Sequence, residues 1–382
     1  MPRYNPVLLE LETYPQQALN QRKAKVLSEG KTLYDFGVGD PQEPVPLFIR
    51  EALQAAVSPH CGYPNVAGPI ALRKSIVGYL KRRYDLDFSP EKHVIPTSGA
   101  KEAVFHAPLV FIDPRVDDRY IVFPDPGYPA YMRGAKFAGA IPYSVSLDGD
   151  YIFRPWLLDE ELLRKTRVIW LNSPHNPSGV CMSLDDLHRT ADVCRKYDIV
   201  CISDETYADI YHQQRPHSIL ECGLENVLAI HSLSKRSGMT GYRSGFLVGD
   251  PVLIAKFKKF RSNPGLVPQN FVNAAAEVAW GDDRHVEQRR EIFAKKKALF
   301  LHFFDQQGWT VLGRDATLYL WLRVPGDEDA QHFALRLLDK GIVVSPGSMF
   351  SVGAMTENYV RLAMVPDIES CHKALSIWKA MI

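Results

Sequence analysis

The chain lacks the signals that mark several classes of protein. Its 6 cysteines form no CxxC pair, and its 12 histidines include no HExxH motif or Cys/His cluster, so we expect no protein-held metal. The 45 Lys and Arg residues balance 44 Asp and Glu residues, which argues against nucleic acid as a partner. No apolar run reaches the length of a membrane span, and the first residues lack the apolar core of a signal peptide. We therefore expect a cytoplasmic protein with reduced cysteines, mostly in its core, and no membrane partner.

The composition is that of a globular protein too long for a single core. Of the 382 residues, 46% are hydrophobic and 23% are charged, and a chain of this length is expected to form two domains. From about residue 285 the pattern predicts a long charged helix, followed by a small α+β unit with a strand over 317–324. We predict a large domain over 46–280, and a small domain formed by 1–45 together with 281–382.

The middle of the chain alternates short apolar runs with helical periodicity. The predicted strands cover 93–96, 119–123, 167–172, 199–203, 227–231 and 245–249. Residues 183–198 predict an amphipathic helix, because Ser183 and Asp186 fit a capping box. Near-continuous apolar strands separated by helices indicate an α/β fold with a mostly parallel sheet covered on both faces, and such sheets bind ligands at the carboxyl ends of their strands.

The stretch HSLSKRSGMTGYRSGFLVGD (231–250) is the most informative part of the chain. Lys235 leaves a buried strand for a glycine-rich turn, where partial desolvation favours the neutral, nucleophilic amine that a Schiff base needs. Arg243 follows in the same turn. A solvated surface lysine is the alternative interpretation.

Two further strand ends carry polar side chains. Asp204 ends the strand 199–203 and precedes Tyr207, so its carboxylate suits a protonated ring nitrogen of a cofactor, although a structural helix cap is an equal alternative. NSPHNPSG follows the strand 167–172, and its irregular backbone can direct Asn176 into a cleft, unless it is an ordinary turn. The neighbouring His175 has no assigned role and is more often structural in such a turn.

Two more sites are predicted to bind anions. In PTSGAKEA, the backbone amides of Gly99, Ala100 and Lys101 at a helix start suit a phosphate, whereas Ser98 reads equally well as a plain helix cap. Arg361 interrupts an apolar run, so a bidentate substrate carboxylate or an internal salt bridge would satisfy it.

In this order, the motifs resemble the pyridoxal-phosphate aminotransferases of fold type I, class I/II, over essentially the whole chain. The matching elements are Gly39, Tyr63, SGAKEA, DPGYPAY, NPSG, SDETY, SLSKRSGMTGYRSG and YVRL. The resemblance implies a large domain with a mostly parallel seven-stranded sheet covered by helices, and a small α+β domain formed by both termini. It also implies pyridoxal 5'-phosphate as cofactor and a homodimer with active sites at its interface.

The resemblance also implies a role for each matched residue. Lys235 would bind the cofactor as a Schiff base and move the proton, and Asp204 would keep the ring nitrogen protonated. Tyr207 and Asn176 would hydrogen-bond the ring oxygen, and Tyr128 would stack on the ring. The implied phosphate-binding residues are Ser98, Gly99, Ala100, Lys101, Ser232 and Arg243, with Tyr63 from the other subunit. The implied substrate-binding residues are Gly39, Asn176 and Arg361.

Several stretches resemble the bacterial N-succinyldiaminopimelate aminotransferases of lysine biosynthesis. They are YNPVLLELETYP at the start, residues 63–84, the lysine turn, and AWGDDRHV at 279–286. The implied reaction moves an amino group between the glutamate/2-oxoglutarate pair and an N-succinyl-diaminopimelate-type keto acid. It follows a ping-pong mechanism through aldimine and ketimine. Arg236, Lys136 and Arg22 are candidates for binding the distal carboxylate.

Other functions remain open. An aspartate, alanine or aromatic aminotransferase, or a carbon–sulfur β-lyase, would share every cofactor residue named above. A nicotinamide-dependent dehydrogenase would need GxGxxG, but Gln42 stands where the third glycine belongs after Gly37 and Gly39. A transcription regulator of this fold would carry an additional DNA-binding domain, and the near-neutral charge argues against one.

Overall fold

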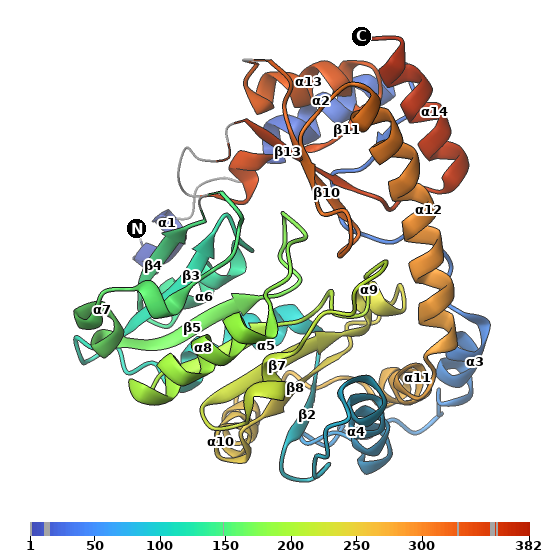
Figure 1. The fold of residues 1–382 in the computed structure, drawn as a ribbon. Helices are drawn as coiled ribbons and strands as arrows, with labels where there is room; N and C mark the ends of the chain where they lie inside the picture. Colours follow the sequence, from blue (N-terminus) through green and yellow to red (C-terminus); the bar gives the residue numbers. More distant parts are fainter. Residues whose placement is uncertain (1, 11–15, 148, 327, 352–355, 357) are drawn as a thin grey trace.

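Helix α12 (Arg284–Gln306) runs from a large lobe built on one sheet to a smaller lobe that contains the C-terminus (Figure 1). The computed structural model describes residues 2–10, 16–147, 149–326, 328–351, 356 and 358–382. The predicted long charged helix after residue 285 is thereby confirmed. The domain boundaries at 45/46 and 280/281 stay a prediction.

A seven-stranded sheet forms the centre of the large lobe. Its strands, in spatial order, are β2 (Val94–Thr97), β8 (Gly245–Gly249), β7 (Val227–Ser232), β6 (Val200–Asp204), β5 (Thr166–Asn172), β3 (Tyr120–Asp125) and β4 (Ile141–Ser146). Strand β8 runs antiparallel to both of its neighbours, and the other neighbouring pairs are parallel. The mostly parallel sheet expected from the sequence is confirmed.

Strand β4 was not among the strands predicted from apolar runs. It lies at the sheet edge, pairs only with β3, and none of its residues is fully buried. Its sequence IPYSVS contains a proline and two serines, which an edge strand tolerates because one side of its backbone pairs with nothing. The other six strands agree with the predicted ranges to within about two residues.

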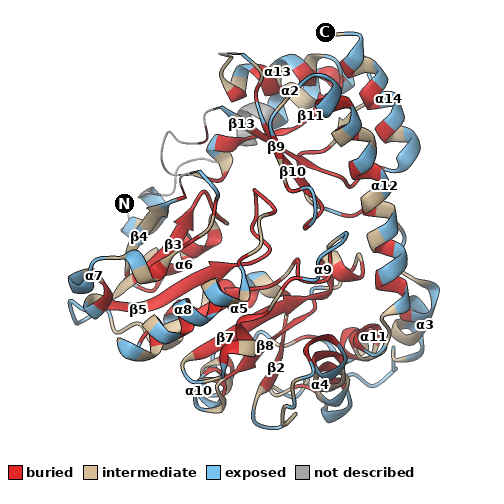
Figure 2. Cartoon of the chain, in the orientation of Figure 1, coloured by how far each residue is buried: buried red, intermediate tan, exposed pale blue. Residues whose placement is uncertain are grey.

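Helices cover both faces of this sheet, so its strands other than β4 are almost entirely buried (Figure 2). Ile169 and Leu171 point into one core, whereas Val168 and Trp170 point into the other, as the two-residue period of a strand requires. Helices α4 (Ile70–Tyr84), α8 (Leu184–Lys196) and α11 (Asn270–Gly281) contribute to the first core. Helices α5 (Ala100–Phe111), α6 (Ala130–Phe137) and α10 (Pro251–Arg261) contribute to the second.

Helix α8 begins as its sequence predicts. The Ser183 hydroxyl accepts a hydrogen bond from the Asp186 amide at 3.1 Å, and the Asp186 carboxylate accepts one from the Ser183 amide at 3.1 Å. The predicted capping box is therefore confirmed.

The smaller lobe joins the two ends of the chain through strand pairing. Strand β1 (Tyr34–Asp35) pairs in parallel with β11 (Ile342–Val343). A four-stranded sheet has the order β12 (Ser345–Pro346), β13 (Tyr359–Ala363), β10 (Tyr319–Arg323) and β9 (Val311–Leu312). Its helices are α2 (Gln16–Ser28), α13 (Ala330–Asp339) and α14 (Ile368–Lys379).

Short elements complete the described chain. They are α1 (Pro6–Glu10), α3 (Leu47–Ala55), η1 (Pro155–Leu157), α7 (Glu160–Lys165), η2 (Ile219–Cys222), α9 (Leu233–Arg236) and η3 (Gly347–Met349). Within the described ranges, no helix is long and apolar enough to cross a bilayer. All 6 cysteines are free, and Cys194, Cys201, Cys222 and Cys371 are buried, as the sequence predicts for reduced core thiols.

Candidate active site

A cavity of about 580 Å³ opens at the carboxyl ends of β5, β6 and β7, between the two lobes. Its lining includes the predicted residues Gly39, Ala100, Lys101, Tyr128, Asn176, Asp204, Tyr207, Ser232, Lys235, Arg243 and Arg361. Tyr63, Ser98 and Gly99 do not line it. The fold therefore brings together residues that lie more than 300 positions apart in the chain, between Gly39 and Arg361.

Lys235 lies in the single turn of helix that follows β7. Ser232 ends the strand, and its hydroxyl accepts a hydrogen bond from the Ser234 amide at 3.1 Å. This hydrogen bond caps the start of the helical turn. The Lys235 amine donates to the carbonyl of Gly39, which also lines the cavity. Burial lowers the pKa of Lys235, which shifts its equilibrium toward the neutral amine that a Schiff base needs.

Asp204 ends β6 with its carboxylate buried in the same cavity. One oxygen accepts hydrogen bonds from the Thr206 hydroxyl at 2.6 Å and the Thr206 amide at 3.2 Å. The other accepts one from the Tyr131 hydroxyl at 3.1 Å. Burial raises the pKa of Asp204, so a cationic partner in the cavity would stabilise the ionised form.

Asn172 was not predicted as a site residue, although it lies at the centre of this arrangement. Its side-chain amide donates to the Asp204 carbonyl at 2.7 Å, and its side-chain oxygen accepts from the Asn176 amide at 2.8 Å. Asn172 and Asp204 are directly paired in the parallel register of β5 and β6. The sequence signal that could have identified Asn172 was its position: it is a polar residue at the end of β5, and Asp204 is a polar residue at the end of the neighbouring β6.

The start of helix α5 forms the predicted anion-binding turn. Gly99 is the N-cap with φ at +80°, and no side chain caps the helix, so the prediction of Ser98 as a cap is wrong. The Glu102 carboxylate instead accepts a hydrogen bond from the Ser98 amide at 2.5 Å. A Cβ atom on Gly99 would lie 2.5 Å from a guanidinium nitrogen of Arg243, so only glycine allows that arginine to approach the helix start.

Arg361 is buried on β13, and no acid among the described residues pairs with it. Its guanidinium donates to the Asn176 side-chain oxygen and to the Gly37 carbonyl, both at 2.8 Å. It forms no ion pair with any acid in the described part of the chain, and its Nε has no hydrogen-bond partner there. The internal salt bridge considered above is therefore absent from this part of the structure. A buried guanidinium in this state suits the carboxylate of a substrate.

Tyr319 joins several of these groups, and the sequence patterns did not single it out. Its ring centroid lies 4.1 Å from the Arg361 guanidinium carbon, and its hydroxyl lies 3.0 Å from that of Tyr207. A Cβ atom on Gly39 would lie 2.3 Å from the Tyr319 oxygen, so the glycine makes room for this ring. Burial raises the pKa of Tyr207, and the neighbouring Tyr319 adds to the shift.

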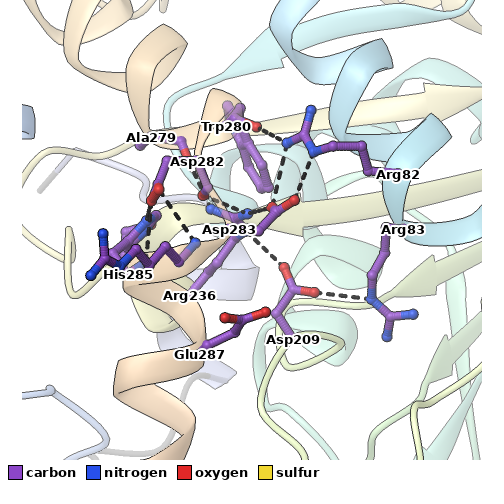
Figure 3. A network of polar contacts seen from close by, with 12 residues as sticks. Arg82, Arg83, Asp209, Arg236, Ala279, Trp280, Asp282, Asp283, His285 and Glu287 are labelled. Carbon is purple, nitrogen blue, oxygen red and sulfur yellow. Dashed lines mark hydrogen bonds and ion pairs between the residues drawn. The ribbon is translucent and has the colours of Figure 1, made fainter.

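None of the three residues predicted as candidates for a distal carboxylate lines this cavity. Arg236 is buried among polar groups, with its Nε 2.8 Å from Asp209 and one Nη 2.7 Å from Asp283 (Figure 3). Arg22 pairs with Asp339 at 2.6 Å. Lys136 lies on α6, outside the lining. In the single chain none of the three candidates reaches this cavity, and the contact to the distal carboxylate stays a prediction.

His175 and Tyr63 also lie outside the lining. The two ring nitrogens of His175 lie 2.7 Å from the Ser178 hydroxyl and 3.0 Å from the Pro126 carbonyl. Burial lowers the pKa of His175 to about 4, so a neutral imidazole holds the turn together. Tyr63 is fully exposed in the single chain.

Residues 31–377 match the family model described as aminotransferase class I and II. The chain belongs to this family. The aminotransferase is 34% identical over 368 residues to the LL-diaminopimelate aminotransferase of Aquifex aeolicus, which covers 94% of each chain. Its fold matches substrate-bound BacF of Bacillus subtilis with a TM-score of 0.92 at 26% identity, covering 100% and 98% of the two chains. A probable N-succinyldiaminopimelate aminotransferase of Thermus thermophilus matches with a TM-score of 0.88, over 96% and 99% of the chains, but at 23% identity this supports the fold alone.

As a member of this family, the enzyme is a transaminase that depends on pyridoxal 5'-phosphate, and the cavity fits that cofactor. The uncapped amides at the start of α5 suit its phosphate, and the buried Asp204 carboxylate suits its protonated ring nitrogen. When bound, the cofactor supplies an electron sink for the α-carbon of the amino acid. Into this cavity the protein presents an amine at Lys235, a hydroxyl at Tyr207 and a guanidinium at Arg361.

Proposed function

We propose that the enzyme transfers an amino group between the glutamate/2-oxoglutarate pair on one side and a diaminopimelate-type substrate on the other, in lysine biosynthesis. The relatives in Aquifex aeolicus and Desulforudis audaxviator, at 34% and 32% identity, are named LL-diaminopimelate aminotransferases, and this supports the substrate class. Those names carry no acyl group, so the N-succinyl substrate expected from the sequence stays a prediction.

The state of Arg361 is the observation that carries the proposal. The guanidinium is 7% exposed and faces the same cavity as Lys235, and no described acid neutralises it. A buried charge without a counter-charge is costly, and a substrate α-carboxylate would remove that cost when it binds. In the proposed roles Arg361 binds the carboxylate, Lys235 moves the proton, and Asp204, Tyr207 and Asn176 hold the cofactor ring.

We further propose that the active enzyme is a homodimer in the cytoplasm. Tyr63 is assigned to the cofactor phosphate by the family resemblance, but it is fully exposed and outside the cavity of its own chain. A second copy that places its Tyr63 in this cavity would satisfy both statements.

A half-reaction titration tests the substrate. Cofactor-loaded enzyme is mixed with single amino donors, and the loss of the cofactor absorption band is followed for each, with Lys235→Ala as the inactive control. We expect glutamate and a diaminopimelate donor to remove the band, with aspartate and aromatic donors weak; comparison of LL-diaminopimelate with its N-succinyl derivative decides the acyl group. Efficient reaction with aspartate or an aromatic donor, and none with either diaminopimelate, would refute the pathway. Pyruvate and sulfide released from cysteine would identify a β-lyase.

A further inference from the structure

A second cavity, of about 160 Å³, lies behind the turn that carries Lys235. It shares no lining residue with the active-site cavity. Its walls come from α4, the chain after β6, the lysine turn and the start of α12 (Figure 3). The arginines in its lining are Arg82, Arg83, Arg215, Arg236 and Arg290.

The acids in this cavity do not balance its arginines. Asp209 is shared between Arg83 at 3.0 Å and Arg236 at 2.8 Å. Asp283 is shared between Arg236 and Arg82, both at 2.7 Å. Glu287 is the third acid in the lining. Five arginines against three carboxylates leave an excess of two positive charges (5 − 3 = 2).

Three of the guanidinium groups are not fully paired by hydrogen bonds or ion pairs within the described part of the chain. Arg83 is 7% exposed, and its Nη1 is buried without a hydrogen-bond partner among the described residues. Arg215 forms no ion pair there and stacks over the Tyr84 ring at 5.8 Å. Arg290 lies over the Tyr211 ring at 4.4 Å, and its distance to Glu287 is 4.0 Å, at the limit of an ion pair. A buried donor without a partner is unfavourable, so an anion in the cavity would be stabilising.

We propose that this cavity binds a phosphate-type oxyanion, either free or as the head of a phosphomonoester. The excess of two charges matches a phosphate group, which carries about −1.5 to −2 at neutral pH. Guanidinium forks match its oxygens, and Arg83, Arg215 and Arg290 approach from three different segments of the chain. The second cavity is linked to the active-site cavity through the chain: Arg236 directly follows Lys235, and Asp209 lies two residues after Tyr207.

Titration calorimetry on the cofactor-loaded enzyme tests this site, since the cofactor already fills the phosphate-binding turn of the active site. Inorganic phosphate and phenyl phosphate are each titrated at constant ionic strength against chloride, with the cofactor absorption recorded throughout. We expect saturable binding of one ion per chain with no change in the cofactor band. Tighter binding of phenyl phosphate would indicate a phosphomonoester, and equal or weaker binding would indicate the free ion.

The double variant Arg215→Gln/Arg290→Gln should weaken phosphate binding at least about tenfold, because each lost charge-assisted bond contributes roughly 1.5–3 kcal/mol. This pair is preferred to Arg83, which also bonds the carbonyls of Ala208 and Pro216 and supports the fold. Arg115→Gln is the matched control, because Arg115 is exposed and pairs with Asp113 outside the cavity. Unchanged amino-transfer by the double variant in phosphate-free buffer shows that it is folded. No saturable binding to the native enzyme, or equal affinity in the double variant, would overturn the proposal.

Discussion

At the residue scale, burial acts in opposite directions on the groups proposed for catalysis. It raises the pKa of Asp204 and lowers that of Lys235, so the charged form of each is disfavoured relative to water. The Arg361 guanidinium lacks an acidic partner among the described residues. In the proposed roles, each of these groups would gain a partner when cofactor and substrate enter the cavity.

Asp204→Asn should weaken cofactor retention and amino-transfer together. The substitution preserves shape but removes the negative charge proposed to face the ring nitrogen. Loss of one member of a buried charge pair costs roughly 3–5 kcal/mol, or about two to four orders of magnitude in kcat/KM. Cofactor dissociation and steady-state rates measure the effect. A variant as fast as the native enzyme would show that Asp204 only holds the turn at Thr206 and Tyr131.

Arg361→Lys should raise KM for every α-amino acid donor, because an ammonium cannot bind a carboxylate through a planar fork. The lost charge-assisted bond corresponds to roughly 10- to 150-fold in kcat/KM. Steady-state kinetics with several donors provide the measurement. If a single donor were affected, Arg361 would contact the distal group of that substrate instead.

Tyr319 combines two contacts that different substitutions can separate. Tyr319→Phe removes the hydroxyl beside Tyr207 and keeps the ring against Arg361, so we expect kcat to change and KM to stay near the native value. Tyr319→Leu also removes the ring, and a cation–π contact of this type is worth roughly 0.5–2 kcal/mol, so KM should rise several-fold. Equal kinetics for the two variants would contradict separate roles.

At the element scale, α12 runs between the two lobes (Figure 1) and carries a buried lysine. Lys297 donates to the carbonyls of Gly313 and Ala316, at 2.6 and 2.7 Å, and thereby holds the segment that leads into β10. Burial lowers the pKa of Lys297 to about 7. The neutral amine still has the two N–H donors that these carbonyls need.

This lysine should make stability depend on pH. Between about pH 7 and its unfolded pKa near 10.4, the unfolded chain binds more protons at this position than the folded chain. Stability should therefore rise with pH over that window, by at most about 1.4 kcal/mol per pH unit, and the full penalty applies below pH 7. Urea unfolding of native and Lys297→Met enzyme at pH 7, 8 and 9 measures the difference. Parallel pH profiles would refute it.

At the scale of the whole molecule, the site is expected to need a second chain. Tyr63→Phe should weaken cofactor retention several-fold, because the cofactor phosphate loses one hydrogen bond worth roughly 0.5–1.5 kcal/mol. Mixing this variant with Lys235→Ala should leave some dimers with one site that carries both native residues, and these sites should retain the cofactor as the native enzyme does. Analytical ultracentrifugation gives the oligomeric state. A fully active monomer would contradict the proposal.

The sequence alone determined the features that depend on neighbours along the chain. Apolar runs and their spacing predicted six of the strands of the large sheet, and the Ser183 cap marked the start of α8. Residues at strand ends, such as Asp204 and Lys235, were predictable because parallel strands bring their carboxyl ends to one edge. The motif order was sufficient for the family.

Only the tertiary structure decided which side chains meet across the fold. Tyr207 and Tyr319 are 112 residues apart, and no local pattern records their contact. Arg236 directly follows Lys235 in sequence, yet its side chain lines the second cavity and not the active-site cavity. The edge strand β4 was missed because it carries too little apolar surface to show a period. Periodicity and strand ends are local properties, whereas charge partners, close approaches at glycine and cavity walls depend on how distant segments pack.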